Sequence, residues 1–293
     1  MKFRLSLFFF LLLSFQTFPG EIIKDDILET KIEKAYSDIY AFHFEDAIAQ
    51  ISQLKKDYPS SPWPYIIASN YHWWMYVAGE NTNKTVKLYY YNVEMAQNRI
   101  SSNKTHPNIF CQLAVFSYLS RFEMMQNDYF SVLSRMKTYL NELLFSLGKE
   151  EEHKAFALTS GLYYYLIQAL YDDYLVLRPL LMLFPEGDKK QGLKLLKETS
   201  SSESSLLSNE ANYFLSKIYA DSEKNYYLAL YYTNNLLQNF PDNFIFLYYY
   251  KTYRAKISME SQEWEVQYEI EKYNNNQLTE KQNKYNNFLY HSF

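Results

Sequence analysis

The chain has 293 residues, of which 48% are hydrophobic and 21% charged, so it can bury a large core and lacks the composition of a disordered protein. It has only 6 glycines and 8 prolines. This scarcity argues against β-rich folds, which need frequent tight turns, and favours long helices. The net charge is −4, without a basic stripe, which argues against non-specific nucleic-acid binding.

Residues 1–20 are predicted to be a signal peptide. Two cations, Lys2 and Arg4, precede an apolar run over 5–15 that is too short to span a bilayer comfortably. Cleavage at the end of this segment predicts export to the periplasm of a bacterium or secretion from it. The alternative is that residues 5–18 are retained and attach the protein to a membrane.

Helical periodicity dominates residues 21–272. In the first segment the apolar residues include Ile32, Ala35 and Ile39, which fall three and four positions apart. The same spacing and its breaks predict helices over 22–42, 44–58, 62–79, 84–101, 107–126, 129–148, 150–171, 188–199, 204–220, 223–239 and 243–258, and a last one from about 261. We expect an irregular stretch over 172–187 and a frayed or disordered tail over 273–293.

An internal repeat is the strongest signal in the sequence. Its two copies are Phe44-x-x-Ala47-Ile48-x-x-Ile51-x-x-Leu54-x-x-x-Tyr58-Pro59 and Tyr226-x-x-Ala229-Leu230-x-x-Thr233-x-x-Leu236-x-x-x-Phe240-Pro241. Ala47 and Ala229 are predicted to lie where two helices approach closely, and the proline ends each unit. A partial third copy begins at Gly192.

The repeat resembles the tetratricopeptide family, in which a small residue of the second helix is followed twelve positions later by a proline. Ala47–Pro59 and Ala229–Pro241 reproduce that interval. The tyrosine of the family's first helix falls at Asp38, and the regions 84–126 and 130–185 contain no clean copy. The resemblance implies an all-α, right-handed superhelix of antiparallel helix pairs over 21–272, with a concave groove of first-helix side chains that binds a protein or peptide.

A second stretch is similar to the inclusion-body-clearance group of tetratricopeptide proteins. It covers residues 161–250 and includes Gly161-Leu162, Pro179 and the run from Gly187 to Leu193. This similarity implies a binding or adaptor role without known chemistry.

The sequence contains no pattern that predicts catalysis, and we expect no enzyme, cofactor or metal site. No P-loop, G-x-G-x-x-G or G-x-S-x-G motif occurs, and the histidines lack zinc-site spacing. The five histidines are His43, His72, His106, His153 and His291. The single cysteine, Cys111, lies in an apolar run and is predicted to be a buried small hydrophobe rather than a nucleophile. The sequence does not name the partner-binding residues.

Two weaker features, both runs of charged residues, have structural explanations. Glu151, Glu152 and His153 are expected to form a solvated first turn of a helix. The pair Asp172-Asp173 is expected in a loop or cap, with Arg178 as the partner of one carboxylate. These charges also argue against a membrane span in the apolar run around them.

Another feature is a dense aromatic cluster: Tyr71, Trp73, Trp74 and Tyr76. Helical spacing puts Tyr71 and Trp74 on one face and Trp73 and Tyr76 on another. One face is expected in the core, and the other is a candidate for the lining of a groove.

Overall fold

The computed structural model describes residue 23, residues 25–261 and residues 278–290. In this part of the chain every regular element is helical, with 14 α-helices, one short 3₁₀ helix and no strand, so the predicted all-α fold is confirmed. The predicted signal peptide, residues 1–20, lies outside the described residues. So do residues 262–277, where the sequence predicts most of the last helix.

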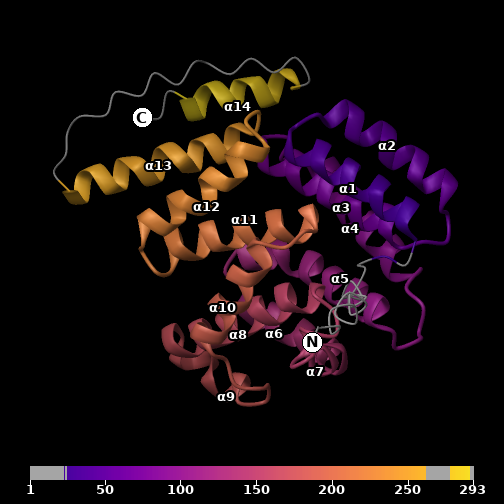
Figure 1. Cartoon of the computed structure of the whole chain (residues 1–293), viewed down its shortest axis with the longest axis vertical. Coiled ribbons are helices and arrows are strands. Elements are labelled where there is room, and N and C mark those ends of the chain that lie inside the picture. The colour runs from indigo at the N-terminus through magenta and orange to yellow at the C-terminus, as the bar shows by residue number, and fades with distance from the viewer. Residues whose placement is uncertain (1–22, 24, 262–277, 291–293) are drawn as a thin grey trace, which may run out of the picture.

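From α1 to α13 the helices follow one another with short connections (Figure 1). They are α1 (Asp26–Tyr40), α2 (Phe44–Asp57), α3 (Trp63–Val77), α4 (Asn83–Gln97), α5 (His106–Met125), α6 (Tyr129–Thr138), α7 (Leu140–Ser146), α8 (Ala155–Asp173), η1 (Leu175–Leu177), α9 (Arg178–Leu181), α10 (Lys189–Ser200), α11 (Ser205–Asp221), α12 (Tyr226–Asn239), α13 (Phe244–Ser261) and α14 (Glu280–Tyr290).

Side-chain caps fix several helix starts where the sequence predicts them. The Asp128 carboxylate accepts a hydrogen bond from the backbone N–H of Ser131 at the start of α6. Asp188 likewise accepts from the N–H groups of Lys190 and Gln191 at the start of α10. Such caps satisfy backbone donors that the first helical turn leaves unpaired.

Two predicted helices differ in the structure. The helix expected over 129–148 is interrupted at Tyr139, which separates α6 from α7. The helix expected from residue 150 begins at Ala155, because the preceding turn folds His153 into the core, where it is 1% exposed. The prediction of a solvated first turn at His153 is therefore wrong.

The tail expected to be frayed over 273–293 contains α14. Tyr285 of α14 packs against Gly79, a turn residue with φ +107° that follows α3. Beside it, Lys281 donates to the Asn81 side chain at 3.0 Å and Gln282 contacts the Met75 sulfur at 3.3 Å. A polar composition hid this docking, because a few side chains are enough to hold a short helix against a preformed surface.

Consecutive helices pair as hairpins: α1 with α2, α3 with α4, α5 with α6 and α7, α8 with α10, and α11 with α12. Ala47 and Ala229 are fully buried in the first and last of these pairs. In the α8–α10 pair, a Cβ atom on Gly192 would lie 2.6 Å from the backbone nitrogen of Tyr165. The small residues of the repeat therefore occupy buried helix contacts, and at Gly192 two backbones touch.

The first helices of the five hairpins form an inner ring. Successive members are in contact, α1 with α3, α3 with α5, α5 with α8 and α8 with α11. The helix α11 then contacts α1, so the ring closes between helices far apart in the sequence, and α12, α13 and α14 follow α11 outside the ring. This closure differs from the open concave groove that the tetratricopeptide resemblance implies.

Candidate functional site

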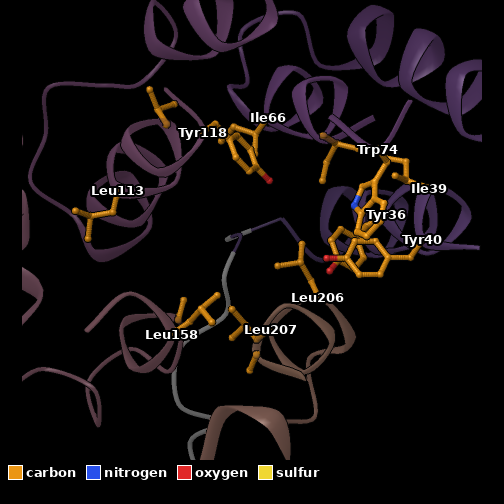
Figure 2. Close-up of a cluster of buried hydrophobic side chains, with 14 of the residues drawn as sticks. Tyr36, Ile39, Tyr40, Ile66, Trp74, Leu113, Tyr118, Leu158, Leu206 and Leu207 are labelled. Carbon is orange, nitrogen blue, oxygen red and sulfur yellow. The ribbon is translucent and has the colours of Figure 1, made fainter. Parts of the chain in front are cut away.

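The inner ring encloses a pocket to which all five of its helices contribute side chains. Space for water-sized molecules inside it is about 70 Å³, several times what one water needs. Figure 2 shows Tyr36 of α1, Ile66 of α3, Leu113 and Tyr118 of α5, Leu158 of α8 and Leu206 of α11 arranged around its centre. The walls are mainly aliphatic and aromatic, and the charged members are Arg121 and Glu210.

Helical spacing brings these two charges into the ring. On α5, Ala114, Ser117 and Arg121 recur at intervals of three and four and line the pocket together. On α11, Leu206, Glu210 and Phe214 line the pocket at intervals of four. Each charge is thus part of a helix face that is otherwise apolar or weakly polar.

Glu210 is held by two tyrosines of α1, far from it in the sequence. Its side chain is 8% exposed, and its Oε1 atom accepts hydrogen bonds from the hydroxyls of Tyr40 at 3.0 Å and Tyr36 at 3.4 Å. Burial, and then the charge of Glu210, raise the pKa of both tyrosines well above the ordinary value, so both remain donors. These bonds connect α1 with α11 and close the ring.

Arg121 faces Glu210 without forming a direct hydrogen bond to it. Its Nη2 atom lies 3.8 Å from Oε2 of Glu210, and its Nη1 atom donates to the Asn70 side-chain oxygen at 3.1 Å. The guanidinium also lies over the Tyr118 ring, 4.2 Å from its centre. Burial by itself would lower the pKa of Arg121, but Tyr118 and Glu210 outweigh it and raise the pKa, so the residue stays charged.

Arg121 and Asn70 have N–H donors without hydrogen-bond partners among the described residues. A guanidinium has five N–H donors, and among the described residues Arg121 bonds to the Asn70 oxygen and to the Tyr118 side chain, which is fewer partners than it has donors. The buried Nδ2 atom of Asn70 also has no hydrogen-bond partner among the described residues. Asn70 itself does not line the pocket, whereas Arg121 does, so the remaining donors of Arg121 are the ones that water or a ligand in the pocket can use.

The electrostatics of the pocket favour a neutral guest. Arg121 and Glu210 have opposite charges and compensate each other across 3.8 Å. A group with both a donor and an acceptor can bond to both of them, whereas a charged group would leave one ion without compensation in an apolar pocket. The aliphatic walls suit an apolar side chain attached to that group.

Of the residues singled out in the sequence, Cys111 is buried, as predicted, and burial raises the pKa of its thiol.

His106 and His153 come together, with ring centres 5.9 Å apart, and His106 lies 3.3 Å from Glu152. Desolvation, and then His106, lower the pKa of His153 to about 4. Across the described residues, no group of three His, Cys, Asp or Glu side chains is arranged to hold a metal ion.

The carboxylate and aromatic candidates also have structural partners. Asp172 pairs with Lys189 at 2.9 Å, while Arg178 donates from Nε to the Tyr171 carbonyl, so the predicted direct pairing with Arg178 is wrong. Trp74 is buried among aromatic rings of α1, α11 and α13. Trp73, on the other face, packs against Phe122 of α5.

Tyr76 packs on the same Phe122 ring, so both faces of this aromatic helix contact other helices. The hypothesis that one face lines a groove is not supported. Within the described part of the chain, no helix is both long enough and apolar enough to cross a membrane.

Sequence reasoning missed Arg121 and Glu210. The available signal was a single charge on an apolar helical stripe, as in Leu206-x-x-x-Glu210-x-x-x-Phe214. Such a charge usually marks a helix edge exposed to solvent, and only the three-dimensional arrangement shows that the two charges meet.

No family model matches this chain, and no curated protein or solved structure shows a significant match to it.

Proposed function

We propose that this chain is an exported, tetratricopeptide-like interaction module that binds a protein or peptide partner and catalyses no reaction. The observation that carries this proposal is the pocket inside the helix ring, with apolar walls and a compensated ion pair in its lining. The export component rests on the N-terminal sequence pattern alone.

A peptide segment has the chemistry that this pocket accepts. Its backbone offers a neutral C=O acceptor for Arg121 and an N–H donor for Glu210, and an adjacent apolar side chain can fill the space between the aliphatic walls. With about 70 Å³ of space, the pocket suits one anchoring side chain rather than a long ligand. A single anchored side chain in a desolvated pocket can dominate the affinity of such a complex.

The test is selection of peptides from a displayed random library on the purified full chain, compared with a pocket-filling variant. Ala114 lines the pocket and is only partly buried, so Ala114→Phe adds a ring to the cavity and leaves the side chains of the ion pair unchanged. We expect selected peptides to share an apolar residue and to lose binding to this variant by at least about tenfold.

Ala49→Phe on the exposed face of α2 is the matched control and should bind like the parent chain. If Ala114→Phe fails to fold, Ser117→Leu fills the same pocket from the next turn of α5. Peptides that bind both pocket variants and the parent equally would rule out the pocket as the binding site.

A further inference from the structure

The segment 174–184, between α8 and α10, forms an apolar tip on the molecule. It carries η1 and α9, and Figure 1 shows α9 at the end of the molecule away from α14. Four of its aliphatic side chains are mostly in solvent: Leu175 (69% exposed), Val176 (71%), Met182 (77%) and Leu183 (64%). Exposed large apolar side chains are common one at a time, but such a cluster in eleven residues marks an interaction surface.

The apolar tip is held in place by its own inward side chains. Leu177, Leu181 and Phe184 are buried, so the segment is anchored to the body of the protein. Folding requires apolar residues only at these inward positions, and polar residues would serve at the outward ones. The outward aliphatic side chains therefore need an explanation other than the core.

A second part of the chain extends the surface. Tyr129, at the start of α6, packs its ring on Tyr174 with ring centres 4.8 Å apart, and the two hydroxyls are 3.2 Å apart. Next to it in sequence Phe130 is 55% exposed, and Met125 at the end of α5 is 49% exposed. Tyrosines at the base of an apolar projection are the arrangement that suits a membrane interface, where rings are apolar and hydroxyls stay wet.

The charges around the apolar tip fit zwitterionic headgroups. Arg178 is the only charged residue within 174–184. Its Nε atom donates a hydrogen bond to the Tyr171 carbonyl. Its two Nη atoms have no hydrogen-bond partner among the described residues, so they can donate to a phosphate. Asp173 and Glu186 are exposed at the two borders, so the surface carries both signs and is not attracted to a strongly anionic membrane.

We propose that the apolar tip inserts Leu175, Val176, Met182 and Leu183 into the surface of a zwitterionic phospholipid membrane, with Arg178 at the level of the phosphates. A projecting surface suits a lipid boundary, whereas a peptide ligand is normally received by a concave site, and the pocket in the helix ring includes no residue of the tip. The surface is separate from the pocket in the helix ring, and this inference does not depend on the proposed peptide binding.

The experiment uses the full chain with Val176→Trp and vesicles of phosphatidylcholine whose acyl chains carry bromine, a contact quencher of tryptophan. The unsubstituted chain, which has 4 tryptophans, provides the background signal. We expect the added tryptophan to be quenched by brominated vesicles and not by ordinary ones. Tyr227→Trp is the matched control, because Tyr227 is 62% exposed on α12, outside the tip, and should not be quenched.

Replacing Leu175 and Met182 by serine in the Val176→Trp chain should weaken the quenching-derived partition coefficient by at least about tenfold, because two aliphatic groups no longer enter the acyl region. This readout reports insertion at the tip even when another segment holds the chain on the vesicle. The proposal is overturned if the added tryptophan is not quenched, or if the serine substitutions leave quenching unchanged.

Two further outcomes also overturn it. Quenching that requires phosphatidylglycerol and disappears in high salt would show electrostatic attachment instead of insertion. Tip-dependent self-association in sedimentation without quenching would assign the surface to a second copy of this chain.

Discussion

The centre of the helix ring and the apolar tip differ from the usual distribution of side chains in opposite ways. In the centre, Arg121 and Glu210 are charged and nearly buried, whereas at the tip Leu175 and Met182 are apolar and mostly exposed. Buried charges and exposed apolar clusters are the informative exceptions on a folded chain. The charged pair in the ring is therefore expected to contribute to the stability of the fold, while the exposed apolar side chains of the tip are expected to contribute nothing to it.

Removing the Glu210 carboxylate should give the largest effect on stability. Glu210→Leu leaves Arg121 uncompensated and removes the acceptor of Tyr36 and Tyr40, so we expect a loss of about 3–5 kcal/mol in the free energy of unfolding. Urea denaturation measures it. Glu203→Gln, at an exposed position just before α11, is the control and should change stability by less than about 0.5 kcal/mol.

A double variant separates charge compensation from packing. Arg121→Met with Glu210→Leu removes both charges and should recover much of the stability that Glu210→Leu loses, because no ion remains unpaired. A double variant no more stable than Glu210→Leu would show that the ion pair is not the reason for the loss.

Gly192→Ala should have the next largest effect. The new Cβ atom would lie 2.6 Å from the Tyr165 backbone nitrogen and 2.7 Å from the Gly161 carbonyl oxygen, so α8 and α10 must separate. We expect a loss of about 1–3 kcal/mol in urea denaturation. Lys194→Ala, on the exposed face of α10, should be close to neutral, and a neutral Gly192→Ala would contradict the close helix contact.

His153 should make stability depend on pH. In the folded chain its pKa is lowered to about 4 by desolvation and by His106, while the unfolded chain takes up the proton near pH 6.5. The unfolded state therefore binds more protons between these values, and stability falls as pH is lowered from about 6.5 toward 4.

His153→Phe should reduce this fall by on the order of 1 kcal/mol at pH 5, allowing for partial solvent screening. The measurement is the urea midpoint at pH 7 and pH 5. The pKa of His72 is also lowered to about 4, by desolvation and then by Lys55, so His72 contributes to the dependence of stability on pH that remains in His153→Phe. An unchanged slope in His153→Phe would show that the pKa of His153 is the same in the folded and the unfolded chain.

The smallest effect is expected at the tip. Leu175→Ser combined with Met182→Ser should change the free energy of unfolding by less than about 0.5 kcal/mol per site, because these side chains bury little surface in the free protein. The readout is the urea midpoint in the absence of lipid. A large loss would mean that the outward side chains stabilise the fold, and the contrast with the ring would disappear.

The sequence alone predicted the helical class and most helix positions. Periodicity and caps such as Asp128 and Asp188 are local signals, because they depend on residues within one or two turns. The repeat also predicted burial of Ala47 and Ala229, which the structure confirms. The helix break at Tyr139 and the buried turn at His153 were missed, because the surrounding helices decide them.

Only the tertiary structure decided the closure of the ring, the docking of α14 and the candidate site. Glu210 is separated from Tyr40 by 170 positions, and no local pattern states that they meet. Whether a charge on an apolar stripe faces solvent or a partner depends on helices far away in the sequence. The sequence pattern therefore determined which face of each helix is buried. The packing of helices distant in the sequence determined which side chains each buried face contacts.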